Sequence, residues 1–432
     1  MKTIHLPYGN TSLELGVPSR ADVLAPTQAP AAIAQPHRAV LDSLASPIGC
    51  PPLQTLIKQN KPETVAITVS DITRPVPNAV FLPAMLDVLN HSGITDSRIV
   101  IIVGTGMHRA STMQEREKLV GKEVLQRVEV IDHVADDPSS LARISEDPPV
   151  SVCRRFAAAD FRIVTGFIEP HFMAGFSGGR KGVCPALVDL GTVQRFHGYD
   201  ALSDPRAEIG NLAQNPCHNI ALEIARAVGV DFLFNVAITH DRRIAGIYCG
   251  DLELAHKAGC RDVAKWTTAK INGAYDLVVT TAGGSPLDHT FYQAVKGMCA
   301  ALPALKEGST LLQVAGCCDG VGSRAYVDLM LRWKNNWKGF LRDIEENRRV
   351  TALDQWEFQM QCRVLERIGV ENLWFVSDGI DIPLQKLLCI NPVQHAGDAK
   401  ERAQWAIVEY IMRHPHAAIA VIPAGPYTML KT

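Results

Sequence analysis

The stretches Thr64-Val65-Ala66-Ile67-Thr68-Val69 and Arg98-Ile99-Val100-Ile101-Ile102-Val103 decide the fold. Both are short runs rich in Val and Ile, a composition typical of buried β-strands. Between them, over Val80–Ser92, apolar residues recur at helical spacing. A strand, a helix and a second strand in this order predict a parallel sheet with covering helices, which is the α/β class.

The same pattern continues along the chain. Further strands are predicted at Phe161–Thr165, Asp276–Thr281, Ser309–Ala315, Leu373–Ser377 and Ala417–Pro423. Further helices are predicted at Pro36–Leu44, Tyr326–Arg349, Asp354–Ile368 and Ala399–His414. Residues 21–52, rich in Ala and Pro, are interpreted as an irregular approach segment. A helical pattern ends and a new strand begins around Lys265–Ala274. We therefore expect two α/β domains, 1–268 and 269–432. Both should have mainly parallel sheets, with an active-site cleft between them.

Composition narrows the class of protein. The chain has 432 residues, 47% of them hydrophobic, and a formal net charge of -2, which argues against a nucleic-acid or membrane-surface partner. Its cysteine count, 11, is odd, and no C-x-x-C motif occurs, so neither a disulfide framework nor a Cys-based zinc site is expected. Met1–Asn10 lacks a signal-peptide pattern, and no apolar run approaches about 18 residues. These features predict a cytoplasmic protein and leave its oligomeric state open.

Polar clusters follow the predicted strands, and ligands of open α/β sheets bind beyond the carboxyl ends of strands. The clusters are Ser70–Pro75, Gly104–Arg109, Gly166–His171, Ala174–Gly182 and, in the second half, Gly283–Asp288 with Phe291–Lys296. Taken alone, Asp71 and Arg74 would suit a helix cap and a surface ion pair. Small residues followed by Arg180 and Lys181 are more specific, because backbone N–H groups there can approach an anion. The stretch nevertheless matches neither the P-loop nor the G-x-G-x-x-G motif.

Three histidines lie in or near these clusters, His108, His171 and His197, but they form no close-spaced ligand pair. They are compatible with three metal ligands. They are equally compatible with one ligand and two acid/base groups. Their spacing leaves both interpretations open.

Five motifs occur in order: D-x-T-R-P, G-x-H-R, E-P-H-x-x-A-G-x-x-G-G-R-K, R-F-H-G and Y-Q-x-x-K. Together they resemble the lactate racemase family of nickel-pincer enzymes, from about Ile4 to Pro423. The resemblance implies a nickel-pincer nucleotide, a pyridinium mononucleotide whose two sulfur groups and a ring carbon bind nickel. This cofactor would be tethered covalently to Lys181, with His197 as the protein ligand to nickel, and would be supplied by cofactor biosynthesis enzymes.

The resemblance also implies roles for other residues. His108 and His171 match the two acid/base groups, and Asp71 matches a residue that supports the Arg74 loop at the cofactor site. The expected cofactor-binding segment comprises Gly175, Ser177, Gly178, Gly179 and Arg180. The expected substrate-binding residues are Arg74, Tyr292, Gln293 and Lys296. The two domains are expected to move relative to each other.

The implied reaction inverts C2 of a 2-hydroxy acid by reversible hydride transfer, which avoids a carbanion beside the carboxylate. Lactate, malate, a longer hydroxy acid and a sugar acid such as gluconate all remain open as substrates. The loop Cys317–Gly322 resembles a family loop but has Asp319 where Glu is expected, so its role stays open beside that of a structural Gly turn. The adjacent pair Cys317 and Cys318 is expected to be buried packing.

Two other classes of function are considered. An NAD-type 2-hydroxyacid dehydrogenase would carry G-x-G-x-x-G after a strand and an acidic residue about 20 positions later, and neither is convincingly present. A non-catalytic carrier of nickel or of the cofactor would need Lys181 and His197. It would not need both His108 and His171, so their presence favours an enzyme.

Overall fold

The computed structural model describes residues 1–432, which form two compact units. The N-terminal unit comprises Ala29–His197 and Arg206–Lys265. The C-terminal unit comprises Met1–Gln28, Gly198–Pro205 and Trp266–Thr432. This division differs from a single cut between residues 268 and 269, because two segments that precede the cut belong with the C-terminal unit.

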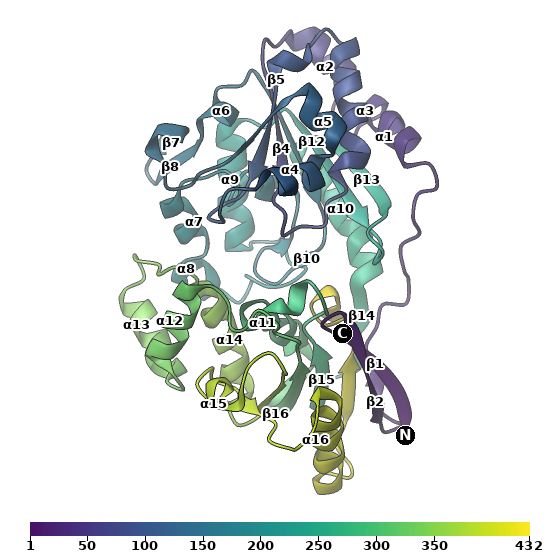
Figure 1. Ribbon diagram of the computed structural model, residues 1–432, viewed down its shortest axis with the longest axis vertical. Helices are drawn as coiled ribbons and strands as arrows, with labels where there is room; N and C mark the ends of the chain where they lie inside the picture. Colours follow the sequence, from purple (N-terminus) through teal and green to yellow (C-terminus); the bar gives the residue numbers. More distant parts are fainter. The chain divides into compact units, whose positions relative to one another are not determined.

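The N-terminal unit is built on a six-stranded sheet (Figure 1). Its strands, in sheet order, are β13 (Ile244–Gly250), β12 (Phe232–Ile238), β9 (Phe161–Phe167), β4 (Val65–Ser70), β5 (Ile99–Gly104) and β6 (Glu129–Asp132). All neighbours are parallel except β12 and β13. The α/β class with mainly parallel sheets is therefore confirmed.

The two faces of this sheet have different neighbours. One face packs against helices α1 (Pro36–Ala45), α2 (Leu53–Asn60) and α3 (Asn78–His91) in a continuous apolar core. The short helix η3 (Gly179–Gly182) packs against strands β4 and β9. The contact is so close that a Cβ atom on Gly182 would come within 2.4 Å of Val164 Cγ1. The Lys-containing loop is thus supported directly by the central strands.

The strand order places the candidate loops beside each other. From β4 the chain proceeds outward through β5 and β6, then returns to β9 on the other side of β4 and continues to β12. The order therefore reverses between β4 and β9, which makes this pair a topological switch point. Loops leaving the carboxyl ends of two such strands diverge and leave room for a ligand. They are the loops that begin at Asp71 and at Ile168.

The C-terminal unit repeats this topology without detectable sequence similarity. Its strands, in sheet order, are β18 (Asn391–Pro392), β17 (Leu373–Val376), β16 (Leu305–Val314), β15 (Tyr275–Thr281), β19 (Ile419–Ile422) and β3 (Asp22–Val23). All are parallel. The order reverses between β15 and β19, and helix α11 (Phe291–Ala301) follows the loop after β15. The α11 residues expected to bind substrate therefore lie near the second switch point.

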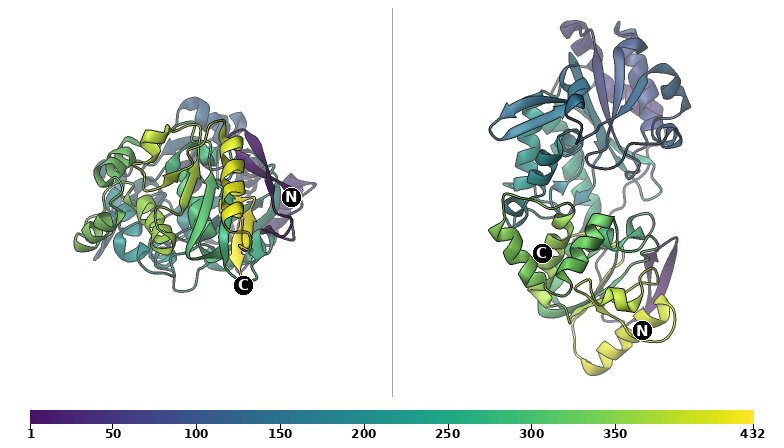
Figure 2. Two further views of the ribbon diagram at one scale, coloured as in Figure 1. Left: turned by 90° about the horizontal axis from the view of Figure 1, so that it is seen from below. Right: turned by 60° about the vertical axis from the view of Figure 1, so that its left-hand side comes forward.

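The N-terminal residues belong to this second sheet for a physical reason. Strands β1 (Lys2–Tyr8) and β2 (Thr11–Val17) form a hairpin whose apolar face packs with helix α16 (Ala399–Arg413) against β15 and β16. In both views of Figure 2 the purple hairpin lies near the yellow C-terminal elements. Strand β3 then pairs with β19, inside the segment interpreted from sequence as irregular.

One predicted helix is wrong in extent. The segment Tyr326–Arg349 contains two helices, α12 (Arg324–Trp333) and α13 (Trp337–Glu346). Asn335 between them adopts a left-handed φ of 57°, and Asn336 caps α13 by accepting a hydrogen bond from the N–H of Gly339. Helical periodicity continues across such a break, because both helices bury their apolar faces.

The predicted helices α1, α14 (Gln355–Ile368) and α16 are confirmed within one or two residues. The other helices are α4 (Met113–Val120), α5 (Lys122–Arg127), α6 (Arg154–Ala157), α7 (Leu190–Phe196), α8 (Tyr199–Leu202), α9 (Pro216–Val228), α10 (Leu252–Thr267) and α15 (Ile382–Gln385). The other strands are β7 (Leu141–Glu146), β8 (Pro149–Cys153), β10 (Pro170–His171), β11 (Gly175–Phe176), β14 (Thr268–Lys270) and β20 (Met429–Lys431). No helix has the length and apolar character to cross a membrane, and all eleven cysteines are free thiols.

Candidate active site

Lys181 is held with its amine largely shielded from water. It lies in η3, is partly buried, and its Nζ is 4.8 Å from the centroid of the Phe196 ring. Burial, together with the charges of Arg180 and Arg74, lowers the pKa of Lys181 to about 7. At neutral pH a large fraction of the amine is therefore unprotonated, which is the form that reacts with an activated acyl or thioacyl carbon.

His197 ends α7, the same helix that carries Phe196. Asp189 caps the start of this helix by accepting a hydrogen bond from the N–H of Thr192. At its other end the His197 Nδ1 lies 2.9 Å from the carbonyl oxygen of Val193. That contact places the ring proton on Nδ1 and leaves the lone pair on Nε2, the arrangement seen for imidazole ligands of metals.

The electrostatics of His197 agree with this tautomer. Burial, together with the nearby charge of Lys181, lowers its pKa to about 3. The imidazole is therefore neutral throughout the physiological range. A neutral imidazole can bind a metal ion, and an amine that is partly unprotonated at neutral pH can form a covalent bond.

The Gly-rich loop before Lys181 is shaped by close approach rather than by flexibility. Gly175 has a φ of 76°, and a Cβ atom there would lie 2.1 Å from the carbonyl oxygen of Asn211. Gly179 has a φ of 55°, and its Cβ would collide with the His256 ring. Its N–H donates to Asn235 Oδ1 on β12 at 2.7 Å. These glycines let the loop pack against neighbouring elements of the N-terminal unit.

Arg180 is directed into the protein. Its guanidinium donates to the carbonyl oxygens of Phe176 and Gly178 at 3.0 and 3.3 Å, and to that of Ala174 at 2.7 Å. The residue is 1% exposed, and burial lowers its pKa to about 10. These contacts hold the loop together. The sequence interpretation treated Arg180 as an anion-binding residue and did not include this structural role.

Ser177 also holds the loop in place through hydrogen bonds to the backbone. Its Oγ donates to the carbonyl oxygen of Phe167 at 2.9 Å and accepts from the N–H of Glu169 at 2.9 Å. The loop is thereby tied to the end of β9. Gly178 is partly exposed between these anchored residues, with a φ of 71° and no side chain.

His108 is oriented by Asp71. The His108 Nδ1 lies 2.6 Å from Asp71 Oδ2, and the other carboxylate oxygen accepts a hydrogen bond from Thr73 Oγ1 at 2.6 Å. Burial opposes ionisation of Asp71, but these hydrogen bonds and the charges of His108 and Arg74 outweigh it, so the pKa of Asp71 lies below its usual value. A carboxylate fixed to Nδ1 orients the ring and aims Nε2 away from the carboxylate.

The side chain of His108 is 54% exposed, whereas that of Asp71 is 10% exposed. The carboxylate is therefore a buried support and the imidazole is the accessible group. The sequence interpretation attached Asp71 to the Arg74 loop. The structure shows that Asp71 also contacts His108. The link to the Arg74 loop is present too, because the N–H of Arg74 donates to the Asp71 carbonyl oxygen at 3.1 Å.

His171 has a contrasting environment. It lies in the β10–β11 hairpin after β9, and its Nδ1 is 3.3 Å from the backbone nitrogens of both Met173 and Ala174. Two N–H donors aimed at Nδ1 favour a ring with its proton on Nε2. The two histidines thus differ, because a carboxylate accepts from Nδ1 of one and backbone N–H groups donate to Nδ1 of the other.

The C-terminal unit contributes Tyr292, Gln293 and Lys296. They lie on one side of α11 at helical spacing, and all three are partly buried. Lys296 Nζ donates to Gln293 Oε1 at 2.5 Å, and Tyr292 Oη accepts from Trp356 Nε1 at 2.7 Å. This polar face can bind an anionic or hydroxylated ligand.

Sequence reasoning missed Asp288, which is fully buried in the loop before α11. Its Oδ2 accepts hydrogen bonds from the N–H groups of Gly9 and Gly316 at 2.7 and 2.9 Å. It therefore joins the N-terminal hairpin to the loops at the end of β15 and β16. Its place in the Gly283–Asp288 cluster was a signal, but its partner Gly9, 279 residues distant in sequence, was not predictable.

Comparison with known proteins is consistent with this geometry. Family models described as the lactate racemase N-terminal and C-terminal domains match residues 8–210 and 271–429. A lactate racemase of Lactiplantibacillus plantarum is 36% identical over 393 residues, which cover 90% of this chain and 89% of the relative. A lactate racemase of Thermoanaerobacterium thermosaccharolyticum is 30% identical over the full length of both chains.

Solved structures agree. The lactate racemase apoprotein of Thermoanaerobacterium thermosaccharolyticum aligns over 100% of both chains with a TM-score of 0.89 and 29% identity. A structural-genomics target from Thermotoga maritima aligns over 91% of this chain and 98% of its own with a TM-score of 0.66. At 17% identity that match shows a shared fold alone. Two family models that together span most of the chain, with relatives similar along their whole length, show that the chain belongs to the lactate racemase family and is an isomerase of the racemase type.

Proposed function

We propose that the protein inverts the C2 configuration of a small 2-hydroxy acid, using a nickel-pincer nucleotide attached covalently to Lys181. The observation that carries the proposal is that Lys181 and His197 both lie against Phe196: the Lys181 Nζ is 4.8 Å from the centroid of that ring, and the His197 ring centroid is 4.6 Å from it. The names of the relatives support a racemase. A reducing cytoplasm, where thiols persist and cofactor-building enzymes work, is the proposed compartment.

The residues present fit such a group. Lys181 would form the thioamide tether, and His197 would donate Nε2 to nickel, because its Nδ1 is engaged by Val193. Nitrogen and sulfur ligands both suit nickel, so one imidazole from the protein would fit beside the sulfur groups of the nucleotide. When bound, the group would accept the α-hydrogen of the substrate as hydride and return it, which is the step that no side chain of this chain can perform.

The side chains would supply proton transfer. His108, supported by Asp71, and His171, with its Nδ1 facing backbone N–H groups, would each serve the hydroxyl of one enantiomer. Two groups are needed because the hydroxyl points in a different direction in each enantiomer. Imidazole suits the task, since its ordinary pKa of about 6.5 lets it give and take a proton near neutrality.

Substrate binding would use the carboxylate that every 2-hydroxy acid carries. Arg74 follows the supported Asp71 turn and is proposed to bind this group through two parallel hydrogen bonds. Tyr292, Gln293 and Lys296 are the proposed contributions of the C-terminal unit. Lactate, malate, longer hydroxy acids and sugar acids such as gluconate share the C2 chemistry, so the proposal is at the level of this class.

Production with the cofactor-building enzymes tests the proposal. Intact mass spectrometry should show one added mass on the chain, with nickel close to one equivalent, and this protein should interconvert the enantiomers of at least one 2-hydroxy acid. Protein made without those enzymes should be inactive. Full activity of protein that carries neither adduct nor nickel would contradict the proposal.

His197→Ala is expected to lose nickel while retaining the organic part of the cofactor. Removing the imidazole takes away the one proposed protein ligand, whereas the covalent bond is made by Lys181. The measurement is nickel content by elemental analysis beside intact mass. His240→Ala, at an exposed histidine of the same unit, is the matched control and should keep both. Unchanged nickel in His197→Ala would remove this residue from the proposed coordination sphere.

Arg74→Lys is expected to raise KM and lower kcat/KM by roughly ten- to a hundredfold, because a flexible point charge replaces a planar two-pronged donor. The readout is steady-state kinetics with both enantiomers. Arg109→Lys, at an exposed arginine paired with Glu115, is the matched control. Wild-type kinetics in Arg74→Lys would show that the guanidinium only stabilises the turn at Asp71.

A further inference from the structure

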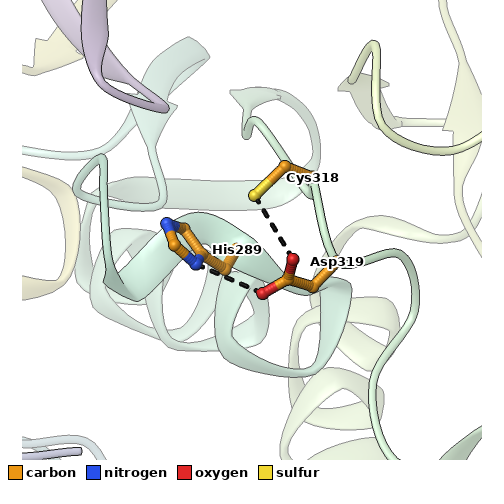
Figure 3. A group of neighbouring side chains, drawn as sticks. All are labelled: His289, Cys318 and Asp319. Atoms are coloured by element: carbon orange, nitrogen blue, oxygen red, sulfur yellow. Dashed lines mark hydrogen bonds and ion pairs between the residues drawn. The ribbon is translucent and has the colours of Figure 1, made fainter.

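Three side chains of different ligand type converge in the C-terminal unit, and no proposed catalytic role uses them. One ligand atom from each of His289, Cys318 and Asp319 lies within 4.8 Å of the others. Figure 3 shows the Asp319 carboxylate facing both the His289 ring and the Cys318 thiol, with one oxygen toward each. His289 ends the short helix η4 (Leu287–His289) after β15, whereas Cys318 and Asp319 follow β16.

Two of the three separations are close to those of a divalent-metal site, each measured to a different carboxylate oxygen of Asp319. His289 Nδ1 is 3.2 Å from Asp319 Oδ2, and Cys318 Sγ is 3.7 Å from Asp319 Oδ1. Tetrahedral zinc, with bonds of about 2.0–2.3 Å to N, O and S, has ligand-to-ligand separations of about 3.3–3.7 Å. Small side-chain rotations would therefore place all three atoms around one ion.

The imidazole has a supporting partner. His289 Nε2 lies 2.9 Å from Ser285 Oγ, so a proton on Nε2 can be donated to the hydroxyl and the Nδ1 lone pair faces the cluster. Metal-binding histidines usually have such an outer hydrogen bond. Ser285 is itself fixed, because its N–H donates to the carbonyl oxygen of Gly9 at 2.8 Å.

The two loops are also joined by their backbones. The N–H of Asp319 donates to the carbonyl oxygen of His289 at 2.8 Å, and the N–H of Cys317 donates to that of Asp288 at 2.7 Å. The ligands are therefore held near their positions without an ion, which reduces the entropy that binding must offset.

The cluster also lies in a negative field. Asp288 is fully buried, and one of its carboxylate oxygens, Oδ1, accepts no hydrogen bond. The carboxylate of Asp319 lies beside the Cys318 thiol, with its Oδ1 3.7 Å from the Cys318 Sγ. A bound cation would compensate these charges. The sequence expectation that Cys317 and Cys318 are both buried is wrong for Cys318, which is exposed and accessible to metal.

We propose that His289, Cys318 and Asp319 bind one divalent cation of the zinc class, with water in the remaining position. Sulfur, imidazole and carboxylate ligands together favour Zn²⁺ or Co²⁺ over Mg²⁺ or Ca²⁺. The ion would clamp the loop before α11 to the loop after β16. Because α11 carries Tyr292, the clamp would hold the start of that helix in place. None of the three residues has a role in the proposed function.

The test is a Co²⁺ titration of the full chain, produced without cofactor, stripped with a chelator and kept reduced. We expect one equivalent of Co²⁺ to produce a thiolate-to-cobalt absorption band in the near ultraviolet. Cys318→Ser should abolish the band, and His289→Gln and Asp319→Asn should weaken binding at least tenfold. Ser285→Ala should weaken it about 10–100-fold through the outer hydrogen bond.

Matched controls separate this site from others. Cys50→Ser, at a partly exposed cysteine of the other unit, and His197→Ala should both keep the band. Zn²⁺ should raise the melting temperature of wild type but not of Cys318→Ser. Because the Cys318 side chain is exposed, this variant should fold as the wild type does. Absence of the band in wild type, or its survival in Cys318→Ser, would overturn the proposal.

Discussion

Lys181→Ala is expected to abolish both the covalent adduct and racemase activity. The amine is the proposed attachment point, and its pKa of about 7 makes it nucleophilic at neutral pH. Lys181→Arg should fail equally, because a guanidinium keeps the charge but not the reactive amine. Lys58→Ala, at an exposed lysine of the same unit, is the matched control. The measurements are intact mass and enantiomer interconversion on protein made with the cofactor-building enzymes.

The lowered pKa of Lys181 can be tested without cofactor. The amine should react with a small acylating reagent increasingly as pH rises through about 7, and lose reactivity below it as it becomes protonated. An ordinary lysine needs a pH near 10 for the same gain. Peptide mapping of brief, pulse-labelled samples measures the profile for Lys181 beside Lys58. An adduct and full activity in Lys181→Ala would refute the covalent role, whereas an ordinary labelling profile would refute only the electrostatic argument.

The central sheets were predictable because their strands are buried on both faces. Continuous apolar runs such as Val65–Ser70 and Ile99–Gly104 leave a clear signal, and the helix between them has its own period. The hairpin β1–β2 also alternates buried and exposed residues, but its membership in the C-terminal unit depends on packing against α16. Pairing between distant segments of a chain cannot be read from local pattern.

The candidate site shows the same limit. Loop residues at strand ends could be named from sequence, since the rule depends only on where strands end. Their partners could not, because Asp71 and His108 are 37 residues apart and meet only through the adjacency of β4 and β5. Arg180 illustrates the converse. A cation in a Gly-rich loop suggests anion binding, but its guanidinium turns inward to three carbonyl oxygens.

His108→Gln and His171→Gln are each expected to reduce interconversion by about 10²–10⁴-fold, the usual contribution of a general acid or base. Both directions of the reaction require both proton transfers, so neither loss is tolerated. Each variant should still process one enantiomer through part of the chemistry, visible as a single-turnover absorbance change with that enantiomer alone. His240→Gln is the control. If a single variant gave the same single-turnover absorbance change with both enantiomers, the assignment of one histidine to each enantiomer would be wrong.

Asp71→Asn should follow His108→Gln and not His171→Gln in its enantiomer preference, because the carboxylate is bonded to His108 Nδ1 alone of the two rings. As a positioning residue, Asp71 should affect kcat more than KM, since an amide no longer holds the His108 ring in the same orientation. A uniform loss for both enantiomers that appears mainly in KM would assign Asp71 to the Arg74 turn instead.

Isotope retention distinguishes hydride transfer from proton abstraction. With substrate deuterated at the α-carbon and ordinary water as solvent, transfer as hydride should leave most of the deuterium in the inverted product. Abstraction by His108 or His171 would pass the hydrogen to an imidazole that exchanges with water. Mass spectrometry of the separated enantiomers at low conversion measures the label. Loss of deuterium as fast as inversion, under conditions where the cofactor hydride does not itself exchange, would exclude the hydride route while leaving membership of the family intact, because the family rests on similarity along the whole chain.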